Sequence, residues 1–427
     1  MESYQLGHLS IVLDQEGAHE FLKVSYPIRY GRFSEIRTPD HIFQFNLNGE
    51  IKYLQGRPQS SPHPEEWLKR TVGNDWIYYS AGDYRGVYDL FGEYYFPCLS
   101  YPSNSILGDR PFDDRTVKSA MRSWPRLRAE TARLISNRIP RELKDFLIRV
   151  NQSDARSLRL KSRQFHRLIG GTVTVLPPDS RHVDYEVIPI IVADGCLYHC
   201  GFCRVKSGQD FAPRSRDDIL EQIGNLKRFY GRDLHNYNAI FLGHHDALGA
   251  GRELLEFVAT RAYEVLDFER SHLKEARLFL FGSPDSMLHS DASLFDCLNR
   301  LPFSTYINIG LESADAATLR ALKKPVPVEK VRDAFERMME INRTYERIEV
   351  TANFVLGGDL PPSHLPSLSE LTRGKLARFY RKGGIYLSPL VGNGSENGRS
   401  TREMLREFRK LKSQSSLPTF VYLIQRL

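Results

Sequence analysis

The chain has 427 residues, of which 41% are hydrophobic and 26% charged, and its formal net charge is +7. These are ordinary globular values, and no apolar run reaches the roughly 18 to 20 residues that cross a bilayer. We therefore expect one larger and one smaller domain, without membrane insertion. The first residues lack the features of a secretory signal, so the expected location is the cytoplasm.

The cysteine and basic residues further restrict the class of protein. Five cysteines are present, three of them within eight residues, which is not the pattern of a secreted disulfide framework. Clustered thiols in a reducing compartment indicate a metal. The basic charge permits an acidic partner such as RNA, and the densest basic stretch spans residues 156–167, where a solvated helix face is the alternative.

The sequence pattern of residues 1–184 predicts an α+β accessory module. Asn48-Gly49 lies between two alternating runs, IFQFNL and EIKYLQ, and this pattern predicts a β-hairpin. Residues 76–99 are rich in aromatic side chains and predict strands, whereas residues 115–135 and 140–150 predict helices. A Leu-Pro-Pro-Asp link at 176–179 marks the expected boundary with the next region.

Residues 185–395 alternate short apolar runs with amphipathic helical stretches, which is the pattern of parallel βα units. Six strands are predicted, and they begin near residues 187, 238, 276, 305, 349 and 384. The first intervening helix follows Ser215, whose side chain is expected to cap it. The expected fold class is α/β, a partial (β/α)6 barrel with an N-terminal α+β module, and residues 396–427 predict a C-terminal helix and tail.

Three cysteines, Cys196, Cys200 and Cys203, lie in one loop directly after the first strand of the barrel region. A cubane iron–sulfur cluster usually takes four thiolates, so a loop that supplies three leaves one iron free for another ligand. Catalytic metal sites keep such a vacancy, whereas structural sites close it. Two alternatives stay open: a zinc site completed by His199 or a distant histidine, and structural thiols without a metal.

The spacing C-x3-C-x2-C, with Phe202 before the last cysteine, resembles the motif of the radical S-adenosylmethionine (SAM) superfamily. The resemblance implies a [4Fe–4S] cluster whose open iron is chelated by the amino and carboxylate groups of SAM. One electron from the cluster then breaks the sulfonium C–S bond, and the resulting 5′-deoxyadenosyl radical abstracts hydrogen from a substrate that the motifs do not specify. It also implies an oxygen-sensitive enzyme with an electron donor such as flavodoxin or ferredoxin.

Polar residues follow the other predicted strands, and active sites of parallel βα barrels form at the carboxyl ends of their strands. Gly243, His244, His245 and Asp246 follow the second strand, where the family often has a Gly-Gly-Glu-like motif that holds the methionine amino group. The resemblance therefore assigns Gly243 and Asp246 to SAM binding. One of the two histidines is a candidate proton donor, with a structural role as the alternative.

Ser283, Glu312, Ser313 and Ser388 follow the third, fourth and sixth strands. The Gly-Leu-Glu-Ser stretch around Glu312 resembles the branch that includes oxygen-independent coproporphyrinogen dehydrogenase and tRNA methylthiotransferases. By that resemblance Glu312 and Ser313 contact SAM, as do Ser283 and Ser388 at their strand ends. The alternative for Glu312 is that it caps the next helix.

The resemblance covers residues 186–395 and includes two departures. The coproporphyrinogen enzyme commonly has a further cysteine where this chain has Val205, and the two remaining cysteines, Cys98 and Cys297, are too few to bind a second cluster. Cys98 is a candidate hydrogen-atom donor or, alternatively, a buried structural thiol.

The preferred hypothesis is a radical SAM enzyme whose aromatic N-terminal module caps the barrel mouth and excludes water. The first alternative is a radical enzyme that modifies tRNA or other RNA. The second is a nucleic-acid-binding protein with a structural metal and no radical chemistry, in which residues 156–167 bind phosphate.

Overall fold

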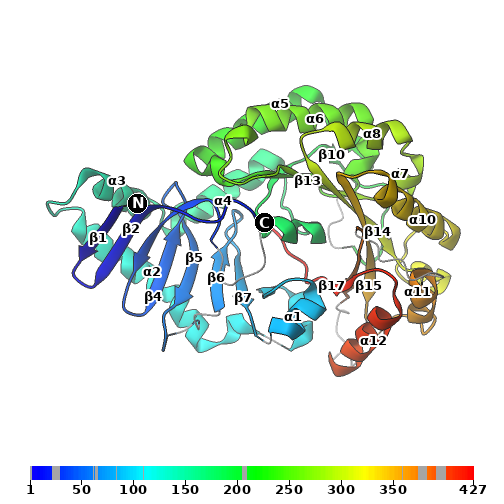
Figure 1. The fold of residues 1–427 in the computed structure, drawn as a ribbon, viewed down its shortest axis with the longest axis horizontal. Helices are drawn as coiled ribbons and strands as arrows, with labels where there is room; N and C mark the ends of the chain where they lie inside the picture. Colours follow the sequence, from blue (N-terminus) through cyan, green and yellow to red (C-terminus); the bar gives the residue numbers. More distant parts are fainter. Residues whose placement is uncertain are drawn as a thin grey trace.

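The computed structural model describes residues 2–21, 29–60, 62, 66–82, 84–108, 110–203, 209–357, 359–373, 382–390 and 401–427. Val205 and the predicted boundary at 395/396 therefore lie outside the described residues. An antiparallel sheet lies beside a parallel one, and the C-terminus lies between them (Figure 1). Within the described ranges, no helix combines the length and the apolar character needed to cross a membrane.

The first eight strands form an antiparallel meander in chain order. The strands are β1 Glu2–Leu6, β2 Leu9–Glu16, β3 Arg32–Arg37, β4 His41–Phe45, β5 Ile51–Gly56, β6 Glu66–Arg70, β7 Trp76–Ser80 and β8 Phe96–Leu99. The predicted hairpin joins β4 to β5, and Gly49 in its turn has a φ of 79°, which glycine adopts without strain.

Helices α2 (Arg115–Leu134) and α3 (Arg141–Gln152) confirm the two helices predicted in this region. They pack on one face of the sheet, where Trp124 and Phe146 contact the ring of Phe45. The prediction of strands throughout residues 76–99 is wrong in its middle, which forms α1 (Tyr84–Phe91). Its apolar residues recur at helical spacing and pack against the barrel core rather than within the sheet.

The second sheet has seven parallel strands in the order β9-β12-β13-β14-β15-β16-β17. The strands are β9 Ile188–Ile190, β12 Ala239–Leu242, β13 Arg277–Gly282, β14 Ser304–Glu312, β15 Ile348–Leu356, β16 Ile385–Pro389 and β17 Thr419–Val421. The six predicted strands and the α/β class are confirmed. The sequence indicated no seventh strand, because three residues are too few to show an alternating pattern.

Helices cover the outer side of this sheet (Figure 1). The helices are α5 Arg216–Tyr230, α6 Arg252–Val265, α7 Pro284–His289, α8 Ala292–Arg300, α9 Ala316–Ala321, α10 Val328–Thr344, α11 His364–Thr372 and α12 Thr401–Gln414. Helix α4 (Ala155–Ile169) packs against α5 and also contacts the N-terminal region. Ser215 caps α5 as predicted, because its side chain accepts a hydrogen bond from the Asp218 amide at 3.1 Å.

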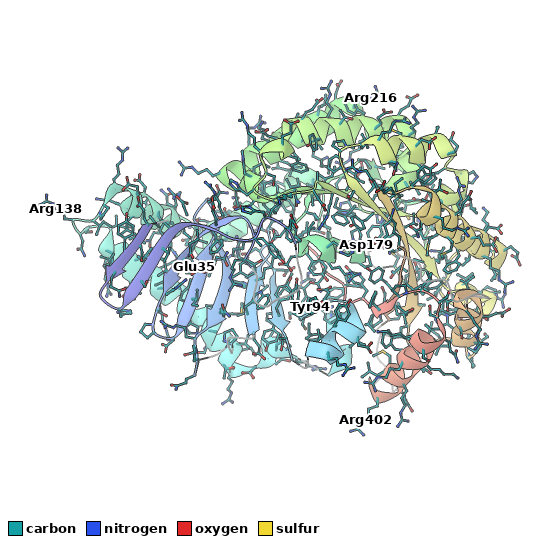
Figure 2. The ribbon with its side chains drawn as sticks, in the orientation of Figure 1. Glu35, Tyr94, Arg138, Asp179, Arg216 and Arg402 are labelled. Carbon is teal, nitrogen blue, oxygen red and sulfur yellow. The ribbon has the colours of Figure 1, made fainter. Side chains whose placement is uncertain are left out.

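The predicted link between the two regions is buried rather than exposed. Residues Pro178–Val183 form a short 3-10 helix, and Asp179 within it lies inside the molecule, whereas Arg138, Arg216 and Arg402 lie at its periphery (Figure 2). The next buried residue, Asp184, ties the link to the N-terminal sheet.

Asp184 is surrounded by side chains of the N-terminal sheet. Its carboxylate accepts hydrogen bonds from the hydroxyls of Tyr53 and Tyr79, each at 3.2 Å, and from that of Tyr95. Lys69 pairs with the same carboxylate at 3.1 Å. Removing one partner of a buried pair typically costs about 3–5 kcal/mol, so this cluster fixes the sheet firmly against the start of the barrel.

Candidate active site

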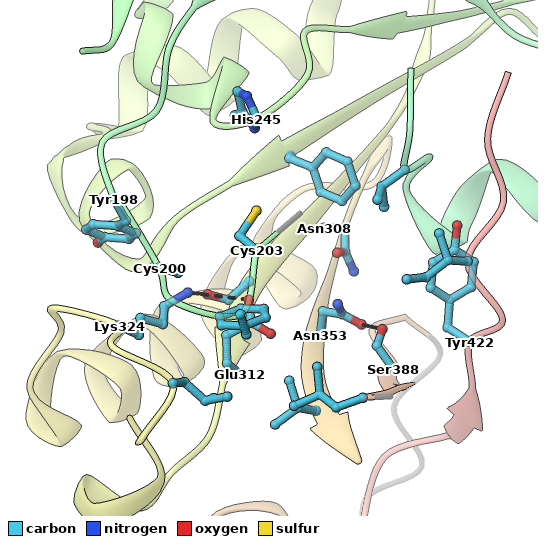
Figure 3. Close-up of a pocket in the computed structure, with 18 of the residues that line it drawn as sticks. Tyr198, Cys200, Cys203, His245, Asn308, Glu312, Lys324, Asn353, Ser388 and Tyr422 are labelled. Carbon is cyan, nitrogen blue, oxygen red and sulfur yellow. Dashed lines mark hydrogen bonds and ion pairs between the residues drawn. The ribbon is translucent and has the colours of Figure 1, made fainter. Parts of the chain in front are cut away.

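A cavity of about 600 Å³ lies at the carboxyl ends of the parallel strands (Figure 3). Most of the predicted site residues line it: Cys196, Cys200, Phe202, Cys203, Asp246, Ser283, Glu312 and Ser388. Gly243 and Ser313 are not among the lining residues. Neither is Cys98, which lies in β8 with its thiol near the Leu99 carbonyl.

The cysteine loop is closed at its base by a two-stranded sheet. Residues Ala193–Asp194 (β10) pair with Ala212–Pro213 (β11). The Arg214 guanidinium donates two hydrogen bonds to the Asp194 carboxylate, at 2.7 and 2.6 Å. Gly195 begins the loop with a φ of 75°, and a Cβ added there would lie 2.0 Å from the Asp210 carbonyl oxygen. Only glycine fits this turn, so Gly195 is required for the loop to close.

The loop presents its three thiols to the cavity. Cys200 is buried, and burial raises the pKa of its thiol to about 11 and also raises that of Cys196. The Tyr198 amide donates a hydrogen bond to the Cys196 sulfur at 3.4 Å, and the Gly201 amide donates to the Leu322 carbonyl at 2.8 Å. Because metals bind the thiolate, a metal bound by these cysteines would displace their protons.

In the part of the chain that the structure describes, no three His, Cys, Asp or Glu side chains are close enough to hold a single metal ion. The donor set does fit a larger group, because the three soft thiol ligands open on one cavity.

Asp246 offers a buried acceptor to the cavity. Gly243 turns the chain after β12 with a φ of 84°, and its amide donates to the Ile190 carbonyl at 2.8 Å. This turn brings Asp246 beside Ser283, whose amide donates to Oδ1 at 3.1 Å. The other oxygen, Oδ2, is buried without a hydrogen-bond partner, and burial raises the carboxyl pKa. A ligand that donates a hydrogen bond to Oδ2 removes this unsatisfied group.

The two histidines after β12 line the cavity wall. Burial lowers the pKa of His244 to about 4, and it also lowers that of His245. Both imidazoles are therefore neutral at pH 7, where each ring can donate one hydrogen bond and accept another.

Glu312 lies at a bulge between β14 and β15 and has a φ of 66°. Its Oε1 lies 3.4 Å from Nζ of the buried Lys324, which also donates to the Gly310 carbonyl at 2.6 Å. Asp315, not Glu312, caps α9, so the capping alternative is wrong.

Ser313 is fully buried behind the cavity wall. Its hydroxyl lies 2.8 Å from Nδ1 of His364, and it also accepts a hydrogen bond from the Asp315 amide at 3.1 Å. The side chain therefore supports the loop after β14, on which Glu312 lies.

Sequence reasoning missed Asn308, Lys324 and Tyr422, all of which line the cavity. Asn308 was detectable, because Asn308, Gly310 and Glu312 alternate along β14 and share one face. Lys324 and Tyr422 had no such signal. Lys324 is positioned by the segment that follows α9, and Tyr422 follows the unpredicted strand β17.

The family model for the radical SAM superfamily matches residues 190–371. Residues 190–371 form a radical SAM domain. Enzymes of the radical SAM superfamily use a [4Fe–4S] cluster and SAM. The match includes the cysteine loop and β12 to β15.

Solved structures with some similarity to this chain share little of its sequence. A radical SAM methyltransferase from Sphaerobacter thermophilus is 16% identical, with a TM-score of 0.37 over 55% of this chain and 65% of that one. The coproporphyrinogen III oxidase HemN from Escherichia coli is 12% identical, with a TM-score of 0.35 over 53% and 51%. Streptococcus suis SuiB, solved with SAM, is 10% identical, with a TM-score of 0.33 over 72% and 62%.

Such low scores carry no argument, so the assignment rests on the domain match. The chain spans less than two thirds of the length of these proteins. No curated protein matches the sequence.

Proposed function

We propose that Cys196, Cys200 and Cys203 bind three irons of the [4Fe–4S] cluster and that the neighbouring cavity holds SAM and the substrate. When bound, the cluster supplies one electron that cleaves SAM to a 5′-deoxyadenosyl radical, which abstracts hydrogen from the substrate. One observation carries the proposal: the three clustered thiols face the same cavity as the buried, unpartnered Oδ2 of Asp246.

The wall residues divide the binding of SAM between them. Asp246 accepts a hydrogen bond from the amino group through its free Oδ2, while Ser283 holds the other oxygen. Glu312 accepts hydrogen bonds from SAM, and the buried Lys324 pairs with its carboxylate. Ser283 and Ser388 offer hydroxyls from the strand ends, and the Phe202 ring contributes an apolar surface.

Gly243 and Ser313 act by positioning. The left-handed φ of Gly243 aims the following segment at the cavity, and Ser313 bonds to His364 beneath the loop that bears Glu312.

Parts of the chain outside the matched domain also line the cavity. Tyr101 and Ser103 come from the N-terminal region, and Tyr422 and Ile424 come from the C-terminal tail. These segments limit the entry of water to the site and so protect a radical from side reactions.

The proposed chemistry requires an external one-electron donor, for which we propose a flavodoxin or ferredoxin, and a reducing compartment, for which we propose the cytoplasm. None of the five cysteines, all within the described residues, forms a disulfide, which supports such a compartment.

The test is to purify the protein without oxygen, measure iron and sulfide, and add SAM with a chemical reductant. We expect about four irons and four sulfides per chain and the formation of 5′-deoxyadenosine. An iron-replete sample that forms no 5′-deoxyadenosine would contradict the proposal, and bound zinc in place of iron would support the structural-metal alternative.

A second candidate, radical modification of RNA, is favoured by one observation on α4. Its exposed arginines recur at helical spacing, and they are Arg156, Arg159, Arg163 and Arg167. The helix ends beside the cavity, because a Cβ added at Gly171 would lie 3.4 Å from the His244 ring. If these arginines bind phosphates of tRNA, replacing all four with Gln lowers the slope of log affinity against log salt by about 0.7 per lost contact. Absence of salt-dependent tRNA binding would remove this candidate.

A further inference from the structure

The side-chain amide of Asn308 is held in one orientation by a chain of hydrogen bonds. The Thr351 hydroxyl donates to Oδ2 of the buried Asp179 at 2.6 Å, and Asn308 Nδ2 lies 2.9 Å from the same hydroxyl. A threonine hydroxyl has a single proton. At pH 8, above the pKa of about 7 to which burial raises Asp179, this carboxyl is mostly ionised. The Thr351 proton then goes to Asp179, and Thr351 can only accept from Asn308. The amide nitrogen of Asn308 therefore points at Thr351, and its oxygen points away.

The oxygen of this amide is left without a partner inside the cavity wall. Asn308 has no solvent exposure, it lines the cavity, and its Oδ1 has no hydrogen-bond partner. Buried acceptors in native proteins are almost always bonded, so an unpaired one in a binding cavity points to a donor on the ligand.

Asn353 supplies the complementary group on the next strand. In the β14–β15 register Asn353 lies opposite Gly310, two residues beyond Asn308 on the same face. The Ser388 hydroxyl donates to Asn353 Oδ1 at 3.0 Å, which leaves Nδ2 as a donor. Figure 3 shows the two amides near one another on the cavity wall. The wall thus presents an acceptor and a donor, both uncharged.

An aromatic ring completes this part of the wall. The Tyr422 hydroxyl donates to the Leu176 carbonyl at 2.6 Å, so its hydrogen is already used. Tyr422 thus offers the cavity the surface of its ring, which suits a planar group.

We propose that Asn308 and Asn353 determine substrate specificity by binding a planar, uncharged amide group, whose N–H donates to Asn308 Oδ1 and whose C=O accepts from Asn353 Nδ2. This deepens the proposed function, on which it rests, by naming the substrate class as carboxamides and their cyclic equivalents. A carboxylate offers no donor to Asn308, and an amidinium offers no acceptor to Asn353. Each of these groups leaves one of the two amides unpaired, and sites built this way reject such analogues.

The test uses three probes of one shape, which are benzamide, benzoate and benzamidine. Binding to the anaerobically purified protein with SAM present is measured at pH 8 by ligand-observed NMR. We expect benzamide to bind at least about tenfold more tightly than the other two. Asn308→Leu and Asn353→Leu reduce this preference to about threefold or less. Asn225→Leu, on the outer helix α5, is the matched control and keeps the preference.

Isosteric variants protect the test against misfolding. Asn308→Asp keeps the size of the side chain and replaces a neutral acceptor with an anion, so benzamidine becomes the preferred probe. Equal binding of the three probes to the wild type overturns the proposal. The proposal is also overturned if Asn308→Leu loses affinity for SAM but keeps the preference for benzamide, because Asn308 and Asn353 would then bind SAM rather than the substrate. Probe binding is measured without turnover, so failure of SAM cleavage counts against the proposed function alone.

Discussion

Lys324 and Glu312 form an ion pair inside the cavity wall, with 3.4 Å between Nζ and Oε1, and both residues are buried. Gly310 makes room for this pair, because a Cβ there would lie 2.8 Å from Glu312 Oε1. Gly310 and Lys324 together thus position the Glu312 carboxylate at the cavity.

Replacing Lys324 with Met leaves the Glu312 carboxylate buried without its cation. We expect the free energy of unfolding in urea to fall by about 3–5 kcal/mol. The double variant Lys324→Met/Glu312→Gln should lose less than the sum of the single variants, since it buries no unpaired charge. Glu264→Gln, in the exposed pair with Arg261, is the control and should change stability by less than about 0.5 kcal/mol. Additive losses would contradict the pairing.

Gly195 provides a test of the cysteine loop that leaves every thiol in place. Gly195→Ala adds a Cβ that would lie 2.0 Å from a backbone oxygen at a residue with positive φ, so the loop cannot close and iron binding should be lost. Gly224→Ala is the matched control, because nothing lies within 4 Å of its Cβ in helix α5. Iron content after anaerobic reconstitution is the measurement, and equal iron in both variants would show that loop closure is not needed.

Asp179 should make probe binding depend on pH. Burial raises the pKa of this carboxyl to about 7. The nearby Glu349 charge also raises the pKa of Asp179, whereas the Arg181 charge and hydrogen bonds from Thr351 and Tyr386 lower it. The hydroxyls of Tyr306 and Tyr422 also lie close enough to Asp179 for electrostatic interaction. Once protonated, Asp179 donates to Thr351, whose own proton then turns to Asn308 and reverses the amide. The preference for benzamide over benzoate should therefore fall between pH 8 and pH 6. A constant preference would contradict this relay.

The same carboxyl should affect stability with a definite sign. Its pKa is raised from 3.8 to about 7 in the folded chain, so between these values the folded state holds a proton that the unfolded state has released. The free energy of unfolding therefore falls as pH rises through this window, by about 1.4 kcal/mol per pH unit from this group. Asp179→Asn should remove that contribution, which urea unfolding at pH 5 and pH 7.5 can measure. An unchanged slope in the variant would show that Asp179 is ionised throughout.

The sequence revealed those parts of the molecule that local patterns specify. The cysteine spacing and the polar strand ends identified most of the cavity wall, because consecutive residues carry both signals. Asn48-Gly49 and Ser215 were predictable for the same reason, since a turn and a cap depend on their own neighbours.

Other features depend on contacts that no local pattern shows. Helix α1 has strand-like aromatic residues, and packing against the barrel core decides its conformation. The relay from Asp179 through Thr351 to Asn308 joins three distant segments, so neither the buried carboxyl nor the fixed amide could be foreseen. Strand β17 depends on its parallel backbone hydrogen bonds with β16, which its own three residues do not indicate.

The central claim is that three particular thiols hold the cluster that cleaves SAM. The most direct measurement is iron, sulfide and 5′-deoxyadenosine in the single variants Cys196→Ala, Cys200→Ala and Cys203→Ala, with Cys297→Ala as the control in helix α8. The account predicts that each of the three loses both the cluster and 5′-deoxyadenosine formation, while Cys297→Ala keeps them. A loop variant with the iron, sulfide and nucleoside yield of the wild type would contradict it.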